Sequence, residues 1–318
     1  MPEANSPVLV VLDSALSAPQ PALHKGGRLA RAWDAPLLVA VNGCSPSLLR
    51  SVGPDDERMA RARLAVEHAW SERFDELLEE AALQEYAVTT RFLWEHDEMT
   101  SLRSLVIRHR PQLVVVRSAE EHGPLNRLFL TPRDWQLLRK APCNVLCVDD
   151  TPWPETLPVL AAVDTEHDGE SLHGLNAAIV KQAIALHDVL HGGLKLCHVV
   201  ERPEETLIMV AGEAIPSYLR DAETQREYYQ GKLEALCEQA GLHGDQALVL
   251  EGVPAVALSE YQRQQGPLLL VLGTVSRSAM GRLLLGSTAE EIVSRAGGDL
   301  LAVKEPDFHS PWEKPDYE

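Results

Sequence analysis

Short apolar runs recur along the chain and alternate with longer amphipathic stretches. The runs are continuous and rich in Val and Leu, as in "PVLVVLDS" from Pro7 and "APLLVAVN" from Ala35. A parallel strand that is buried on both faces shows this pattern. Between the runs, the stretch from Asp55 to Gln84 places apolar residues at three- and four-residue intervals, which is typical of an amphipathic helix. The alternation predicts an α/β fold.

The series of runs occurs twice along the chain. "PVLVVLDS" returns as "PVLAAVDT" from Pro158, so that Asp13 and Asp164 each close a first strand. Three further runs match in the same order: "APLLVAVN" with "GLKLCHVV", "PQLVVVRS" with "GPLLLVLGT", and "CNVLCVDD" with "GDLLAVKE". Five strands alternating with four helices in each half predict two tandem doubly wound domains, each a five-stranded parallel sheet flanked by helices.

Proline-rich segments mark the boundaries of the two halves. "DTPWPETLP" lies between them, and its three prolines can neither continue a helix nor donate to a ladder. We therefore expect domains over residues 1–150 and 158–305. The last stretch, "PDFHSPWEKPDYE" over residues 306–318, also has three prolines and is expected to be an extended segment on the surface.

Charge and composition exclude several classes of partner. The formal net charge is -18, which argues against nonspecific nucleic-acid binding and against an anionic membrane surface. No stretch has the length of a membrane span, and no basic flank precedes the first apolar run. The five cysteines are odd in number and scattered, with no second pair to complete a zinc set. These features predict a cytoplasmic protein without a metal site of its own.

The carboxyl ends of the strands are where a doubly wound sheet binds its ligands. In the second half, Asp164 closes the first strand and Gly273 closes the fourth. A loop then leads to Gly286, and Ser287 and Thr288 open the next helix. Glycines allow the backbone to approach a ligand closely, and the free N–H groups of a helix start favour an anion. The pattern predicts an anion site in this loop.

Each of these features also has a purely structural explanation. A glycine after a strand often serves only a turn, and a Ser-Thr pair or an Asp often serves only as a helix cap. His198 lies in an apolar strand and is typical of a hydrogen-bonded core histidine. The sequence has no P-loop, H-E-x-x-H or G-x-S-x-G motif, so we expect no enzyme, although slow ATP hydrolysis stays open.

With these features, the chain resembles the universal stress protein family. The loop is similar to the family's G-x-x-G-x(9)-G-[ST] signature, with Gly273, Ser276, Gly286 and Ser287 at its four defined positions. "AVDTEHDGESLHGLNAAI" resembles the family's first strand and helix, and "LCHVVE" resembles its second strand. "LFLTPRDWQLLRKAPCNVLCV" in the first half resembles a segment of the tandem-domain, UspE-like branch.

The resemblance implies an adenine-nucleotide alpha-hydrolase-like fold and a stress-response sensor that binds ATP, with magnesium. In ATP-binding members, the equivalent of Asp164 contacts ribose or metal, the backbone at Val199 meets the adenine, and the loop from Gly273 to Thr288 wraps the phosphates. Ser276 replaces a glycine of the signature. If that position needs a positive φ, the serine costs about 1 kcal/mol.

The resemblance also implies an assembly. The single chain would mimic the dimer of one-domain members by pairing its two final strands, as a monomer or as a dimer of such monomers.

The first half departs further from the signature. When the two halves are aligned in a common frame, residue by residue from the matching fourth strands, each signature position has a different residue in the first half. The residues that replace Gly273, Ser276, Gly286 and Ser287 are, in that order, Arg117, Glu120, Leu130 and Thr131. A bulky Leu and an acidic Glu both oppose phosphate binding, and Asp13 becomes a helix cap. We therefore expect nucleotide binding only in the second half. The alternative is a degenerate scaffold that binds no nucleotide, only an apolar small molecule or a partner protein.

Overall fold

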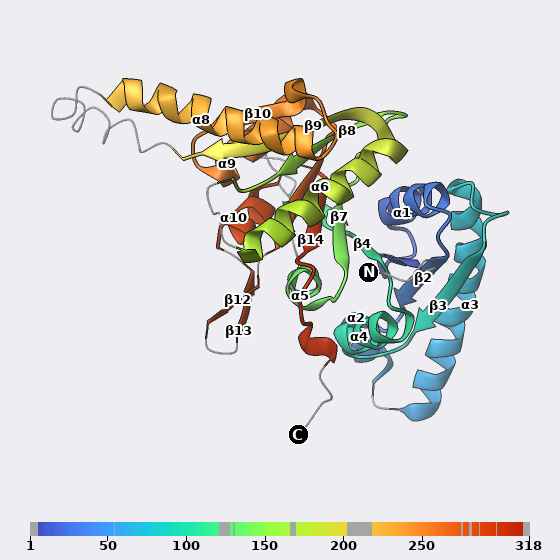
Figure 1. Cartoon of the computed structure of the whole chain (residues 1–318). Coiled ribbons are helices and arrows are strands. Elements are labelled where there is room, and N and C mark those ends of the chain that lie inside the picture. Colours follow the sequence, from blue (N-terminus) through green and yellow to red (C-terminus); the bar gives the residue numbers. More distant parts are fainter. Residues whose placement is uncertain are drawn as a thin grey trace. The chain divides into compact units, whose positions relative to one another are not determined.

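The computed structural model describes residues 6–53, 55–120, 128–129, 131–165, 170–201, 218–274, 276–279, 282–285, 287–296 and 298–313 (Figure 1). The chain divides into two compact units. The first comprises Met1–Glu120, Leu130–Pro152 and His309–Glu318, and the second comprises Glu121–Phe129 and Trp153–Phe308.

The first unit is built on five parallel strands in the order β3-β2-β1-β4-β7. In chain order, its strands are β1 (Val8–Val11), β2 (Leu37–Asn42), β3 (Val88–Leu93), β4 (Leu113–Arg117), β5 (Ala119–Glu120) and β7 (Asn144–Val148). Its helices are α1 (Pro21–Ala32), α2 (Pro46–Val52), α3 (Asp56–Glu80), α4 (Glu98–His109), α5 (Pro132–Lys140) and the short 3-10 helix η2 (Pro311–Glu313). The central strands β1 and β4 pair with their neighbours on both sides.

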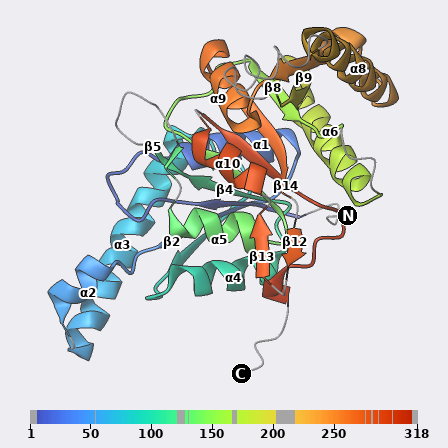
Figure 2. The ribbon, with the colours of Figure 1, turned by 90° about the vertical axis from the view of Figure 1, so that its left-hand side faces the viewer.

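The second unit repeats this arrangement in the order β10-β9-β8-β11-β14. Its strands are β6 (Leu128–Phe129), β8 (Leu157–Ala162), β9 (His191–Val200), β10 (Ala247–Glu251), β11 (Leu269–Thr274), β12 (Ser276–Ala279), β13 (Arg282–Leu285) and β14 (Leu300–Lys304). Its helices are α6 (Glu170–Leu190), α8 (Tyr218–Gln239), η1 (Gly244–Gln246), α9 (Pro254–Gln265) and α10 (Ser287–Arg295). Helix α8 packs along β9 and β10, and α6 packs along β8 and β9 (Figures 1 and 2).

The expected fold class is confirmed in both units. The first strand of each sheet, β1 or β8, pairs with the second strand on one side and with the fourth on the other. This is the point at which the strand order reverses, and it gathers the ends of β1 and β4, or of β8 and β11, at one edge. Candidate ligand-binding residues therefore converge there in each unit.

Burial follows the apolar pattern of the sequence. All residues of β1 and β2 are buried, as expected for strands covered on both faces. Helix α3 begins at Asp56, one residue after its cap Asp55, and buries Trp70, Phe74 and Leu77 in its second half. Helix α1 lies close to the sheet because Gly26 faces it, where a Cβ would come within 2.5 Å of Val10 Cγ2.

The described part of the last stretch, residues 306–313, is not simply the extended surface segment that the prolines predicted. Residues Pro311–Glu313 form η2, and Ser310 and Trp312 are buried in the first unit. Ser310 is 1% exposed and Trp312 is 7% exposed. Pro311 is compatible with this ending because proline suits the first position of a helix, where its missing N–H has no partner to lose.

Within the described parts of the chain, no helix has both the length and the apolar character that crossing a membrane requires.

Candidate functional site

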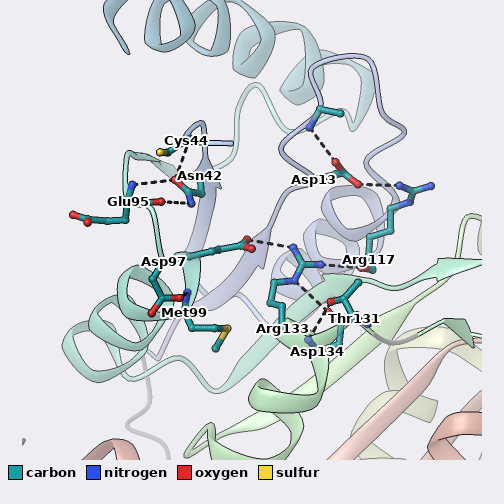
Figure 3. A network of polar contacts seen from close by, with 12 residues as sticks. Asp13, Asn42, Cys44, Glu95, Asp97, Met99, Arg117, Thr131, Arg133 and Asp134 are labelled. Atoms are coloured by element: carbon teal, nitrogen blue, oxygen red, sulfur yellow. Dashed lines mark hydrogen bonds and ion pairs between the residues drawn. The ribbon is translucent and has the colours of Figure 1, made fainter. Parts of the chain in front are cut away.

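Arg117 lies at the switch point of the first unit, that is, where the strand order reverses between β1 and β4 (Figure 3). Its guanidinium donates from Nη1 to Asp13 Oδ2 over 3.0 Å, and from Nε and Nη2 to the two carboxylate oxygens of Asp150 over 2.6 and 2.7 Å. The hydrogen bonds to Asp150 are the main reason that the pKa of Arg117 is raised. The arginine thus bridges two carboxylates, one after β1 and one after β7. A positively charged side chain fills the place where the first unit would hold a ligand.

The register confirms that Arg117 and Gly273 are equivalent. The residue before each one pairs with the first strand of its own sheet at the same level: Val116 with Val11, and Leu272 with Ala162. The signature glycine of the second unit is therefore replaced by the bridging arginine in the first, as the common frame predicted.

A second arginine, Arg133, closes the same end of the sheet. It donates from Nη1 to Glu98 Oε1 over 3.3 Å, from Nε to Asp134 Oδ1 over 3.2 Å, and from Nη2 to the backbone oxygen of Arg117 over 3.1 Å (Figure 3). Burial lowers the pKa of Arg133, but the carboxylates of Asp134 and Glu98 outweigh it and leave the pKa raised. Asp134 is fully buried.

The start of α5 is capped by its own residues. Thr131 Oγ1 accepts from the N–H of Asp134 over 3.3 Å, and Asp134 Oδ2 accepts from the N–H of Thr131 over 2.9 Å. This reciprocal capping box uses the backbone donors that a phosphate would need at a helix start. An acidic side chain already lies where an anion would bind.

The start of α5 also corrects one part of the sequence frame. Helix α5 begins at Pro132 and α10 begins at Ser287. The last strands keep that spacing, because Arg117 pairs with Val148 and Gly273 with Val303. The loop is therefore one residue shorter in the second unit than in the first.

The alignment of Leu130 with Gly286 and of Thr131 with Ser287 was therefore wrong. Thr131 takes the place of Gly286, and Pro132 takes the place of Ser287. Leu130 and Gly286 themselves lie outside the described residues. The conclusion that the first unit lacks the signature glycines is unchanged.

The side-chain amide of Asn42 forms hydrogen bonds at the end of β2, the strand next to β1 in the first unit. By the register of β2 with β1 and of β9 with β8, Asn42 is the counterpart of Val199. Asn42 Nδ2 donates to the backbone oxygen of Glu95 over 2.9 Å, and its Oδ1 accepts from the N–H groups of Glu95 and Cys44 over 3.2 and 3.3 Å (Figure 3). The end of β2 is thereby tied to the residues after β3.

Asp164 of the second unit keeps the backbone geometry of Asp13. Asn176 Oδ1 accepts from the N–H of Asp164 over 3.2 Å, and its Nδ2 donates to the Asp164 oxygen over 2.6 Å. Gln20 clamps Asp13 in the same two-sided way, over 2.9 and 3.1 Å. Both aspartates therefore have a fixed backbone, and the difference between the units lies in what faces their carboxylates.

Gly273 owes its identity to helix packing. A Cβ at this position would come within 2.6 Å of Leu175 Cδ2 and 2.9 Å of Ile179 Cδ1, both on α6. Its backbone does not have a positive φ. The glycine therefore lets α6 approach the end of β11, and no side chain extends from this position, in contrast to Arg117 in the first unit.

The loop after Gly273 forms a hairpin. Strands β12 and β13 pair in antiparallel fashion, with Ser276 opposite Leu285. Ser276 thus lies in extended backbone, where φ is negative, and the cost expected for a serine with positive φ does not arise. Because the hairpin closes at Ser276 and Leu285, the beginning and the end of the loop converge. Ser287 and Thr288 then open α10.

The charge after the last strand differs between the units. In the first unit, Asp149 follows β7 and binds the buried Lys25, whose Nζ donates to Asp149 Oδ1 over 2.9 Å. In the second unit, the buried Lys304 takes the place of Asp149, because Val148 and Val303 are equivalent and precede them. The side chain at this position therefore carries a negative charge in the first unit and a positive charge in the second.

His198 is buried, as expected of a core histidine, but only one ring nitrogen has a described partner. Its Nδ1 lies 3.3 Å from the oxygen of Val163 and 3.5 Å from the nitrogen of Thr165. The Nε2 atom has no hydrogen-bond partner among the described residues. Val199, the next residue, is half-buried and pairs with Leu250. Among the described residues, no cluster of three or more His, Cys, Asp or Glu could hold a metal ion.

Several residues of this geometry escaped sequence reasoning. They are the clamps Gln20, Asn42 and Asn176 and the ion-pair partners Lys25, Glu98, Arg133 and Asp134. The only available signal was Thr131 followed three residues later by Asp134, a variant of the capping-box pattern.

A model described as "Universal stress protein family" matches residues 5–149 and 158–304 of the chain. Universal stress protein E of Escherichia coli strain K12 is 29% identical over 232 residues, which cover 73% of this chain and 72% of that protein. The universal stress protein E homolog of Haemophilus influenzae is 30% identical over 229 residues, which cover 71% and 73%.

One solved structure shows the same fold over nearly the whole length. A protein of unknown function from Pseudomonas aeruginosa, PA1789, superposes with a TM-score of 0.71 at 22% identity, covering 96% of this chain and 94% of that one.

Proposed function

Because this chain belongs to the universal stress protein family, we propose that it is a stress-response binding protein that takes an adenine nucleotide in its second half only. One observation carries the proposal: Gly273 and Arg117 occupy equivalent positions. In the first unit the arginine bridges Asp13 and Asp150, whereas in the second no side chain extends from that position. The dedicated role is binding, without catalysis of a reaction.

In the second unit the residues at the switch point have separable tasks. The carboxylate of Asp164 would hold ribose hydroxyls or the magnesium ion that accompanies ATP. The backbone of Val199 would meet the adenine. The loop from Gly273 through Ser276 and Gly286 to Ser287 and Thr288 would hold the phosphates at the start of α10.

The first unit disfavours a nucleotide for electrostatic reasons. A ligand at its switch point would have to break the bonds of Arg117 to two carboxylates, so that Asp13 and Asp150 would face the phosphates without this arginine. It would also meet Asp134, which already caps α5. Negatively charged carboxylates beside negatively charged phosphates repel each other, and this repulsion opposes binding.

A second candidate function, a scaffold that binds no nucleotide, is favoured by the hairpin. Strands β12 and β13 pair their backbone groups with each other over Ser276–Ala279 and Arg282–Leu285. Backbone donors used in this way are not available to a phosphate. In this alternative, an apolar small molecule or a partner protein is the ligand.

A thermal-stability titration separates the two functions. ATP and magnesium are added to the wild-type chain, to Asp164→Asn and to the matched control Asp13→Asn. A ligand at a hundred times its Kd stabilises the folded state by about 2.7 kcal/mol, which raises the melting temperature measurably. We expect this shift for the wild type and Asp13→Asn, and a much smaller one for Asp164→Asn.

Other outcomes reject the proposal. No shift of the wild-type chain with ATP, ADP or AMP favours the scaffold. An equal loss in both variants places the nucleotide at a site that does not distinguish the halves. Asp13→Asn is a fair control because Arg117 keeps its two bonds to Asp150.

The location and assembly are further parts of the proposal. None of the five cysteines, all of which lie in the described residues, forms a disulfide, and this suits the cytoplasm, where thiols stay reduced. The two halves would form an intramolecular pseudo-dimer through their final strands. Light scattering distinguishes a monomer from a dimer of such chains.

A further inference from the structure

A short motif follows each family domain. Thr151, Pro152 and Trp153 begin two residues after the end of the first match, at residue 149. Ser310, Pro311 and Trp312 follow the second match, which ends at residue 304. A hydroxyl residue, a proline and a tryptophan thus recur in the same order outside both matched domains. The family fold does not account for them.

The second motif is anchored in the first unit by polar contacts at each end. The Ser310 hydroxyl donates to the backbone oxygen of Lys140, the last residue of α5, and accepts from the N–H of Trp312 over 3.1 Å. Arg103 Nη2, on α4, donates to the backbone oxygen of Trp312 over 3.4 Å. Since the last carbonyls of a helix have no partner within it, the serine satisfies one at the end of α5.

The burial of this segment is selective. Ser310 and Trp312 are 1% and 7% exposed, whereas His309 and Glu313 on either side are exposed. A tail lying loosely on a surface would not bury a serine and a tryptophan while leaving their neighbours in solvent. The first unit therefore recognises two particular side chains of the motif.

The tryptophan of the first motif makes a contact inside the second unit. Trp153 belongs to that unit, and its indole N–H donates to the carboxylate of Asp299, the residue before β14. Asp299 lies between α10 and β14, and by the register its counterpart in the first unit is Asn144, just beyond the end of α5. Thr151 is exposed and its hydroxyl does not repeat the role of Ser310. The tryptophan is the shared anchor, and the serine adds specificity in the second motif.

We propose that the end of α5, together with α4, is a docking site for a Ser-Pro-Trp segment, and that its occupant is the chain's own C-terminal segment, residues 309–313. The site is a separable binding surface: it takes a peptide that carries the motif whenever the chain's own segment is removed. The proposal does not depend on nucleotide binding.

The test is binding of a synthetic peptide with the sequence of residues 306–318 to full-length variants. Trp312→Ala releases the resident segment, and the matched control His309→Ala changes an exposed residue of the same segment. A segment in cis acts at an effective concentration on the order of millimolar, so it excludes a micromolar peptide from the wild-type site. We expect the peptide to bind Trp312→Ala at least about ten-fold more tightly than the wild type or His309→Ala.

Several results overturn the proposal. These are no binding to Trp312→Ala, equal binding to all three chains, or equal binding of a peptide in which Trp312 is replaced by Ala. Ser310→Ala serves as a second opened chain if Trp312→Ala does not fold. A wild-type chain that light scattering shows to be a dimer joined by exchanged C-terminal segments would assign the site to a second copy and refute the cis occupant.

Discussion

Replacing Arg117 by Ala should destabilise the first unit, and the bonds of its guanidinium indicate by how much. The Arg117 side chain is 19% exposed, and those of Asp13 and Asp150 are 34% and 33% exposed. A single bond between half-exposed charges, as to Asp13, contributes about 0.5 kcal/mol. The bidentate pair with Asp150 is stronger in geometry but shares this solvent screening, so we assign it about 1–1.5 kcal/mol. We expect Arg117→Ala to lose about 2 kcal/mol.

The assay is urea unfolding combined with hydrogen exchange in β1 and β4. A chain of two compact units needs a probe inside the unit that is perturbed, since unfolding of the whole chain need not be two-state. Double-mutant cycles with Asp13→Asn and Asp150→Asn separate the two pairs. The coupling to Asp150 should exceed the coupling to Asp13. Additive effects, or an Arg117→Ala chain as stable as the wild type, would refute the bridge.

Three further predictions rest on packing and titration. Gly273→Ala should lose about 1–3 kcal/mol in urea unfolding, because its Cβ would come within 2.6 Å of Leu175 Cδ2; a neutral result contradicts this packing. Burial, and then a nearby aspartate, raise the pKa of Glu305 above 4.5, so the stability of the wild type relative to Glu305→Gln should fall as the pH rises through that raised pKa. Urea titrations across this pH range check the sign, and the opposite slope rejects it. Burial raises the pKa of Cys197 to about 12, so iodoacetamide should label the partly exposed Cys143 first in the native chain, and mass spectrometry reads the order.

The repeated apolar runs were sufficient to predict the fold. Strands such as β1 and β4 are buried on both faces, so their residues are constrained to be apolar. Continuous apolar runs in the sequence therefore predict these strands. The equivalence of Arg117 with Gly273 also followed from the sequence, because the matching apolar runs "PQLVVVRS" and "GPLLLVLGT" place these two residues at the same point, and the register agrees. Regular elements with a strict period are what a sequence shows best.

The sequence did not predict the contacts between residues that are distant along the chain. Asn42 and Glu95 are far apart in sequence, and nothing in either segment reveals that an amide joins them. The one-residue difference in the loop was also hidden, because a loop has no period from which to count. The difference in loop length follows from the first residues of the two helices, Pro132 of α5 and Ser287 of α10.

The C-terminal segment shows a different limit. Its prolines suggested an extended chain, but the burial of Ser310 and Trp312 depends on α4 and α5, whose sequences carry no sign of it. Local propensity was overridden by tertiary contacts.

The number of nucleotides bound to one chain tests the central claim most directly. Native mass spectrometry with ATP and magnesium counts them on the wild type, Asp13→Asn and Asp164→Asn. Arg117 bridges two carboxylates in the first unit, whereas Gly273 extends no side chain from the equivalent position of the second. This difference predicts one nucleotide on the wild type and on Asp13→Asn, and none on Asp164→Asn. Two nucleotides on the wild type, or one retained by Asp164→Asn, would contradict the account.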